Sequence, residues 1–115
     1  NVTGSLNRFR DIIYVDDVVN ALKMSLTFEN SNIFNLSTGV KTTIKELIDT
    51  IIKVLGKNKE DFIIENVGGH LGDQQGCVGN NKKLIKKGWE VKYDLETGIN
   101  KFIEYIKNNE HNISK

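Results

Sequence analysis

The chain has 115 residues, 38% of them hydrophobic, and a formal net charge of +1, which fits one domain or a piece of one with a single modest core. The near-neutral charge argues against a strong field for nucleic acid or an acidic membrane, and no apolar run approaches the roughly 20 residues that span a bilayer. The single Cys77 cannot form an internal disulfide, so a reducing cytoplasm is the expected compartment and a small filler residue its expected role.

The first part of the chain predicts a strand-helix-strand unit. Residues 9–15 are rich in β-forming residues, and their adjacent isoleucines predict a strand that is covered on both faces. Asp16 or Asp17 is expected to cap a helix that ends near Leu26. The inner stripe of that helix would be Val18, Ala21, Leu22 and either Ser25 or Leu26. A short second strand is expected over 33–36.

The next segment predicts a well-defined helix. Thr43 and Glu46 fit a capping box, in which each side chain bonds to the backbone N–H of the other residue. Apolar residues then recur at helical spacing, and Gly56 is expected to end the helix in a left-handed conformation. Residues 62–67 predict a third strand.

The last part of the chain predicts a glycine-rich loop and two helices. Residues 68–79 contain five of the ten glycines, a helix is expected from about Asn81 to Gly88, and Asp94 should cap the final helix. Trp89 is expected to pack against that final helix. Strands that alternate with helices predict a small layered α/β fold, with about three strands and four helices.

Arg10 is the first candidate binding residue. Most of the positive charge is lysine, but Arg8 and Arg10 lie together near the start of the first strand. A guanidinium offers a rigid fork that matches two phosphate oxygens. From the residue alone, a salt bridge to Asp11 or another carboxylate is the alternative. Arg8 is interpreted as a surface or accessory charge.

Two acidic or hydroxyl patterns have structural alternatives. Asp16 and Asp17 could form a carboxylate pair for acid–base or metal chemistry, but a helix cap and a first-turn acid explain them as well. Thr43 could contact a phosphate at a helix N-terminus, and plain capping is the alternative.

The glycine-rich loop and a lysine cluster carry weaker patterns. The loop lacks both the G-x-G-x-x-G spacing of a dinucleotide site and the Gly-Lys-Ser/Thr of a phosphate-binding P-loop, so a mobile surface loop is one interpretation. Four lysines, at 82, 83, 86 and 87, form one face of the expected short helix. A solvated face is the interpretation we prefer to nucleic-acid binding, because the sequence indicates no neighbouring aromatic residues for base stacking.

An ordered set of motifs resembles a known family. Arg10-Asp-Ile-Ile-Tyr-Val-Asp-Asp-Val18, Asn35-Leu-Ser-Thr-Gly39, Gly72-Asp-Gln and Gly88-Trp89 together resemble the C-terminal part of the extended short-chain dehydrogenase/reductases. These are nucleotide-sugar epimerases and dehydratases such as UDP-glucose 4-epimerase, and the likeness covers residues 10–105. The resemblance implies that 1–40 complete a Rossmann-type cofactor domain and that 41–115 form a small substrate-binding domain.

The resemblance also implies residue roles. Arg10 would contact the diphosphate of a nucleoside-diphosphate sugar, and Asp73 would reach the ribose of the nucleotide. His70 stands where the family has an arginine that clamps the phosphates, and a histidine can also donate to phosphate. The family base is a tyrosine followed four residues later by lysine, but positions 18, 97 and 109 hold Val, Thr and Asn.

The resulting hypothesis is a substrate-binding portion of an NAD- or NADP-dependent enzyme. We expect no catalytic residue, no metal site and no cofactor bound by this part of the enzyme, and therefore no turnover by the chain alone. A stand-alone binding or dimerisation module with the same fold is the alternative, because a truncated edge would expose apolar surface.

Overall fold

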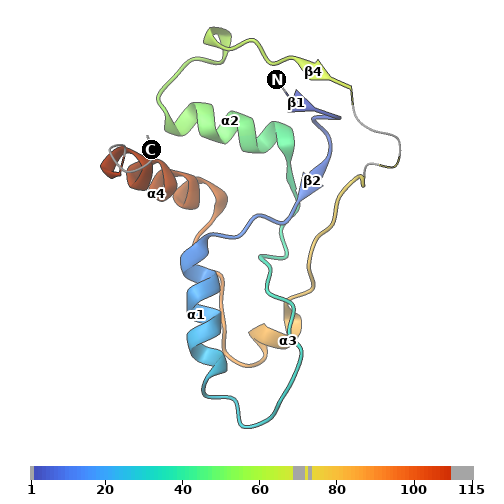
Figure 1. The fold of residues 1–115 in the computed structure, drawn as a ribbon, viewed down its shortest axis with the longest axis vertical. Coiled ribbons are helices and arrows are strands. Elements are labelled where there is room, and N and C mark those ends of the chain that lie inside the picture. Colours follow the sequence, from blue (N-terminus) through green and yellow to red (C-terminus); the bar gives the residue numbers. More distant parts are fainter. Residues whose placement is uncertain (1, 69–71, 73, 110–115) are drawn as a thin grey trace.

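The computed structural model describes residues 2–68, 72 and 74–109, which form two groups of helices joined by extended segments (Figure 1). In chain order the elements are β1 (Val2–Thr3), β2 (Phe9–Arg10), α1 (Val15–Ser25), β3 (Thr42–Thr43), α2 (Ile44–Val54), the short 3₁₀ helix η1 (Lys59–Asp61), β4 (Asn66–Val67), α3 (Lys82–Ile85) and α4 (Leu95–Asn108). The α/β class and the four expected helices are confirmed.

The strands are shorter than expected and differently placed. β1 pairs with β4 in parallel and β2 pairs with β3 antiparallel, while β1 and β3 were not expected. Only Phe9–Arg10 of the predicted strand 9–15 joins a sheet, and only Asn66–Val67 of 62–67 does. Residues 33–36 form no strand. A strand exists only where a neighbouring strand completes its hydrogen bonds, and the described residues offer no such neighbour there.

The prediction that Asp16 or Asp17 caps α1 is wrong. The N-cap is Tyr14, whose side chain makes no cap hydrogen bond, and both aspartates lie in the first turn. Asp17 is instead turned inward, where the backbone N–H groups of Lys92 and Tyr93 donate to its carboxylate. The predicted end of the helix is confirmed, since Leu26 is the C-cap.

The caps of the later helices are confirmed. The Thr43 hydroxyl accepts from the Glu46 N–H, while Glu46 Oε2 accepts from the Thr43 N–H at 2.7 Å. Asp94 Oδ1 accepts from the Thr97 N–H at 2.8 Å at the start of α4. Gly56 follows α2 with a φ of 64°, a left-handed conformation that favours glycine. These bonds join residues close in sequence, which is why the local pattern predicts them.

The small core lies between α1 and α3. Ala21, Leu84 and Trp89 are buried together, and the Trp89 Nε1–H donates to the carbonyl oxygen of Asp17. The expectation that Trp89 packs against the final helix is therefore wrong, because the turn after α3 directs it toward α1. Leu22 and Leu26, placed on the inner stripe by the sequence, are 60% and 86% exposed.

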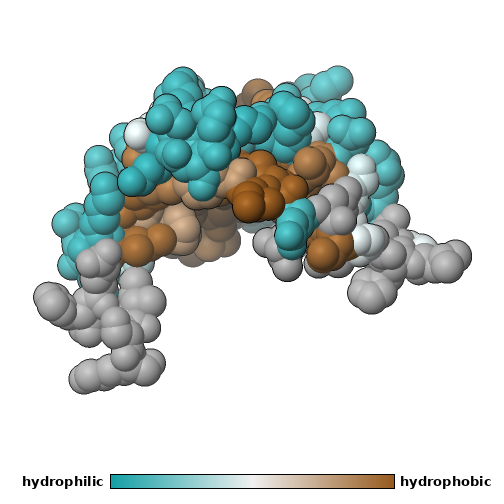
Figure 2. All heavy atoms as spheres, turned by 90° about the horizontal axis from the view of Figure 1, so that it is seen from above, coloured by the Kyte–Doolittle hydropathy of each residue, from teal (hydrophilic) through white to brown (hydrophobic). Residues whose placement is uncertain are grey.

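An apolar groove lies between α2, α4 and the start of α1. It has a volume of about 770 Å³, and its walls include Ile13, Leu47, Ile51, Ile99, Phe102 and Ile103. Hydrophobic surface is exposed beside a hydrophilic rim in Figure 2. The radius of gyration is 17.0 Å, against roughly 13 Å for a compact domain of this length. The chain is thus open, and much of its apolar surface lacks a cover.

Candidate functional site

Arg10 lies in β2, and its side chain has no ion-pair partner among the described residues. The residue is half-buried, and its backbone is paired with Thr42 of β3. Nη1 donates to the carbonyl oxygen of Phe9 at 2.7 Å. Within the described residues the ion pairs join Lys45 to Asp49, Lys53 to Glu96 and Lys59 to Asp49, and none involves Arg10. The salt bridge to Asp11 that the sequence allowed does not form, because that carboxylate is engaged elsewhere.

The Asp11 carboxylate joins three segments of the chain, and we call Asp11, Thr38, Gly39 and Gly79 the Asp11 junction. Oδ1 accepts from the backbone N–H of Thr38 at 2.7 Å and from its hydroxyl at 2.6 Å. Oδ2 accepts from the N–H of Gly39 at 2.9 Å and of Gly79 at 3.1 Å. Residues 37–39 and 76–79, far apart in sequence, therefore meet beside Arg10.

These bonds keep Asp11 ionised. Burial by itself would raise the pKa of the carboxyl, but the hydrogen bonds from Thr38, Gly39 and Gly79 outweigh it and lower the pKa below its ordinary value of 3.8. Because the pKa of Asp11 is lower in the folded state than in the unfolded chain, the junction stabilises the fold fully at pH values above the ordinary pKa of 3.8. Its contribution is lost as the pH falls through the lowered pKa.

The described end of the glycine-rich segment runs beside β2. The N–H of Phe9 donates to the carbonyl oxygen of Gln75 at 3.1 Å, and Phe9 and Gly76 form an isolated bridge. A Cβ on Gly76 would lie 2.5 Å from the Phe9 carbonyl oxygen, and one on Gly79 would lie 2.4 Å from the Ser37 side chain. These two glycines thus permit close contact between segments.

Two of the predicted site residues, His70 and Asp73, lie outside the described residues. Their convergence with Arg10 on one pocket stays a prediction. The described residues of the same segment, Gln75 and Gly76, contact Phe9, which directly precedes Arg10. Arg10 lines neither the apolar groove nor a second, shallow hollow beside Phe34.

The structure favours the capping role for Thr43 over a phosphate contact. The Thr43 hydroxyl and N–H both donate to Glu46 Oε2. The next two amides of α2 are also used, since Ile44 donates to the Arg8 carbonyl and Lys45 to the Leu6 carbonyl. An anion at this helix end would have to displace bonds within the chain.

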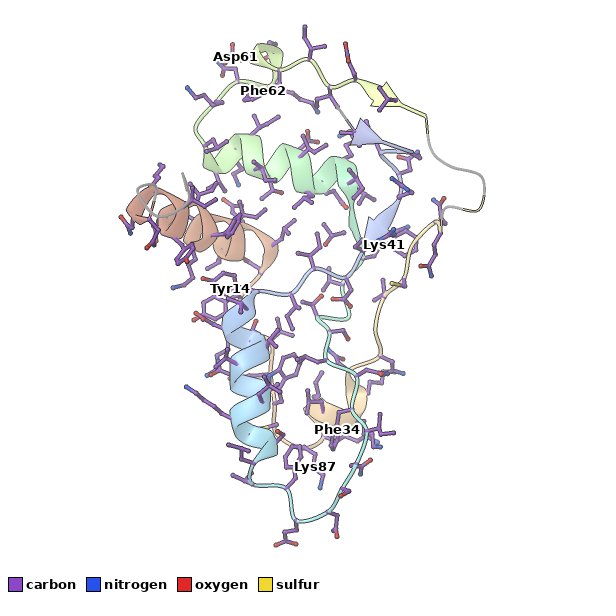
Figure 3. The ribbon with its side chains drawn as sticks, viewed as in Figure 1. Tyr14, Phe34, Lys41, Asp61, Phe62 and Lys87 are labelled. Atoms are coloured by element: carbon purple, nitrogen blue, oxygen red, sulfur yellow. The ribbon has the colours of Figure 1, made fainter. Side chains whose placement is uncertain are left out.

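The lysine face of α3 is partly packed on aromatic rings, which the sequence interpretation did not expect. The Nζ of Lys83 lies 5.2 Å from the Phe34 ring and that of Lys87 5.7 Å from the Phe28 ring. The two rings contact each other with centroids 5.2 Å apart. Phe34 and Lys87 line the shallow hollow, which has a volume of about 270 Å³ (Figure 3). The rings pack against the core, so they are not a free stacking platform.

Sequence reasoning missed three features of the structure. Asp11 was considered only as a partner of Arg10, because its distant donors, Thr38 and Gly79, leave no local signal in the sequence. Asp17 is fully buried, which a helix-cap interpretation does not predict. Lys41 lies with its Nζ 4.4 Å from the centre of the Phe9 ring. It packs against Phe9 beside β2 and is labelled in Figure 3.

Two of the three tyrosines, Tyr14 and Tyr93, pack on each other. Tyr14 lies where α1 begins beside α4 (Figure 3), and its ring packs on that of Tyr93 with centroids 5.0 Å apart. Gly98 of α4 is buried, and a Cβ there would lie 3.3 Å from Tyr14 Cβ. The described residues hold no group of three or more metal-ligating side chains. In the same part of the chain, no helix has the length and apolar character to cross a membrane.

Comparison with known proteins finds sugar-nucleotide enzymes. The chain is 33% identical over 112 residues to the dTDP-4-dehydro-6-deoxyglucose reductase of Escherichia coli, an alignment that covers 93% of the chain and 34% of the relative. The chain spans about a third of the length of the curated relatives it matches. No model of a protein family matches it.

Solved structures of similar enzymes have the same fold over the matched part. The dTDP-glucose 4,6-dehydratase of Bacillus anthracis, in complex with NAD, superposes with a TM-score of 0.82 at 28% identity, over 96% of this chain and 35% of that enzyme. The UDP-glucose 4-epimerase of Thermotoga maritima, with UDP-glucose, gives 0.80 at 30% identity, over 94% and 34%. The fold is thus part of a Rossmann-type epimerase or dehydratase.

The sequence identity and the structural superposition together indicate the relationship of the chain to a family. By sequence and structure the chain is homologous to part of the NAD-dependent nucleotide-sugar epimerases and dehydratases of the extended short-chain dehydrogenase/reductase family, and it covers about a third of their length. These relatives are enzymes. The predicted family and fold class are confirmed.

The described part of the glycine-rich segment does not have the features of a site for NAD, the cofactor in the structure from Bacillus anthracis. The glycine-rich segment lacks the dinucleotide spacing, and the helix after it, Lys82–Ile85, is one turn long. Gly76 and Gly79 are packed against Phe9 and Ser37, so they do not form an open cradle for a diphosphate.

Proposed function

We propose that this chain is the nucleotide-sugar-binding C-terminal portion of an NAD- or NADP-dependent sugar epimerase or dehydratase. In the proposed enzyme the cofactor and the catalytic base come from a further part of the fold, as expected from the missing Tyr-x-x-x-Lys pattern. This portion would hold the nucleoside diphosphate so that the sugar reaches the reacting groups. The cytoplasm remains the expected compartment.

The observation that carries the proposal is that the Arg10 side chain has few partners within the described residues. Its side chain makes one hydrogen bond, to a neighbouring carbonyl, and no ion pair within the described residues. The carboxylate next to it is committed to four donors of the Asp11 junction. The backbone of Arg10 is fixed in the sheet, and most of the guanidinium N–H groups make no hydrogen bond within the described residues. Such a group can donate to the oxygens of a diphosphate. His70 and Asp73 belong to the proposed site as predictions from the family resemblance.

The test of this proposal is calorimetric titration of the chain with UDP-, dTDP-, GDP- and CDP-glucose. We expect one of them to bind and Arg10→Ala to weaken that binding about 10- to 100-fold, because a charge-assisted contact to phosphate contributes roughly 1.5–3 kcal/mol. Arg10→Lys keeps the charge but loses the fork, so its affinity should lie between the two.

Lys86→Ala serves as a surface control, since Lys86 is an exposed cation at the end of α3. It should bind the nucleotide sugar as the wild type does. Equal affinity of wild type and Arg10→Ala would contradict the assigned role of Arg10. No binding of any of the four nucleotide sugars by the wild type would contradict the proposed function itself.

The apolar groove favours a second candidate function, a dimerisation module. Phe102 in its wall is 56% exposed, and exposed apolar surface of this kind marks interaction sites. If the groove is self-complementary, gel filtration with light scattering should show a fraction of dimer that rises with protein concentration. The variant Phe102→Asp should be a monomer. The matched control is Asn100→Asp, an exposed position on the same helix. A wild type that stays monomeric at every concentration rules this function out.

A further inference from the structure

We infer that Asp11 is a positioning residue, whose carboxylate holds the backbone around Arg10 so that the guanidinium is set for a diphosphate. The inference rests on the proposed function and adds a residue that acts through Arg10 without touching the ligand. It starts from the Asp11 junction, in which one carboxylate accepts four hydrogen bonds of 2.6–3.1 Å.

The donors show what the carboxylate does. Thr38 is 27 residues from Asp11 in sequence and Gly79 is 68 residues away. The bonds therefore close long loops and bring two distant segments to the residue that follows Arg10. Before Asp11, the backbone of Phe9 and Arg10 is held by the ladder with Thr43 and Thr42. The backbone that carries the guanidinium is thus fixed before and after it, while its side chain has one bond, to Phe9.

The packing leaves little freedom in this arrangement. A Cβ on Gly79 would lie 2.4 Å from Ser37 Oγ, so the segment 76–79 approaches 37–39 as closely as a glycine allows. Asn81 adds a buried bond between the same two regions, because its Nδ2 donates to the Ser37 carbonyl at 2.9 Å. The junction is therefore a defined contact of three segments and not a loose surface cluster.

Asp11→Asn separates geometry from charge. The variant keeps the size of the side chain, but its NH₂ group would face backbone N–H donors, so part of the junction must open. It also removes a negative charge beside Arg10, which by electrostatics alone would tighten the binding of an anion. Weaker binding in this variant can therefore be assigned to lost positioning.

The experiment titrates the 115-residue chain with inorganic pyrophosphate and with UDP-glucose, and follows the fold through the fluorescence of Trp89, the single tryptophan. We expect Asp11→Asn to bind both probes about ten-fold more weakly, in the range of couplings between contacting residues. Thr38→Val should show a smaller loss in the same direction, and Thr38→Ser, which keeps the hydroxyl, should bind as the wild type does.

A control variant and a double variant make the result specific. Asp49→Asn changes the same charge on the exposed side of α2, where Asp49 pairs with Lys45 and Lys59, and should not alter the affinity. Because Asp11 acts through Arg10, the double variant Arg10→Ala/Asp11→Asn should bind no more weakly than Arg10→Ala. Losses that add in the double variant would overturn the inference, and so would an Asp11→Asn variant that binds as tightly as the wild type.

The remaining outcomes are also decisive. If Asp11→Asn unfolds by the Trp89 signal, the pair Thr38→Val and Thr38→Ser decides, and equal affinities in that pair overturn the inference. A wild type that binds neither probe overturns the proposed function together with this inference. A wild type that binds, with loss in Arg10→Ala but none in the Asp11 and Thr38 variants, overturns the inference alone.

Discussion

Replacing Asp17 by alanine is expected to destabilise the fold by about 2–4 kcal/mol, because it leaves two backbone N–H groups without their acceptor in a buried place. The carboxylate is fully buried and accepts from Lys92 at 3.1 and 3.3 Å and from Tyr93 at 3.2 Å. Domains of this size are stable by roughly 5–15 kcal/mol, so the loss is a large share of the total. Urea unfolding followed by Trp89 fluorescence measures it.

The neighbouring acid provides a matched control. Asp16 also lies in the first turn of α1, where its negative charge interacts favourably with the helix dipole. It makes no side-chain hydrogen bond within the described residues. Asp16→Ala should therefore change the stability by less than about 1 kcal/mol. Equal urea midpoints for the two alanine variants would show that the buried bonds of Asp17 do not stabilise the fold.

The second large effect is on activity, since the chain alone is expected to show no turnover. Hydride transfer requires a nicotinamide, a base and the sugar in one geometry. The sequence contains no tyrosine with a lysine four residues later, and the glycine segment does not fit a dinucleotide. Incubation with NAD and the four nucleotide sugars, with chromatography of the products, should return the substrates unchanged.

The control for that assay is the UDP-glucose 4-epimerase of Thermotoga maritima, which resembles this chain over a third of its length. It should convert UDP-glucose under the same conditions and so demonstrate that the assay detects epimerisation. Product formed by the 115-residue chain without any added protein would show that catalytic groups lie within it, and would contradict the assignment of the base to another part of the enzyme. Binding without turnover is the combined result that we expect.

Local patterns predicted the helices and their ends well. The capping box of Thr43 and Glu46 and the cap of Asp94 on Thr97 join residues three apart, so the interaction and its signal lie in the same short stretch. Arg10 could be singled out in the same way, from its chemistry and its place in a motif. What the sequence could not supply was the distant partners of polar side chains such as Asp11 and Asp17.

The strand predictions were limited by the same lack of information on distant contacts. Residues 33–36 have the composition of a strand, yet the described residues provide no neighbour for them, and Leu22 and Leu26 have the spacing of a buried stripe but are exposed. Composition and periodicity describe what a segment can do against a suitable surface. Whether that surface is present depends on the rest of the fold.

The sequence by itself determined the presence of the helices, the caps of α2 and α4 and the family motifs, because these depend on contacts between residues a few positions apart. Only the tertiary structure decided that Asp11 gathers segments 27 and 68 residues away, and that Asp17 is buried under the backbone of residues 92 and 93. Such bonds depend on where distant loops meet in space. A carboxylate in the sequence carries no sign of which distant N–H groups will reach it.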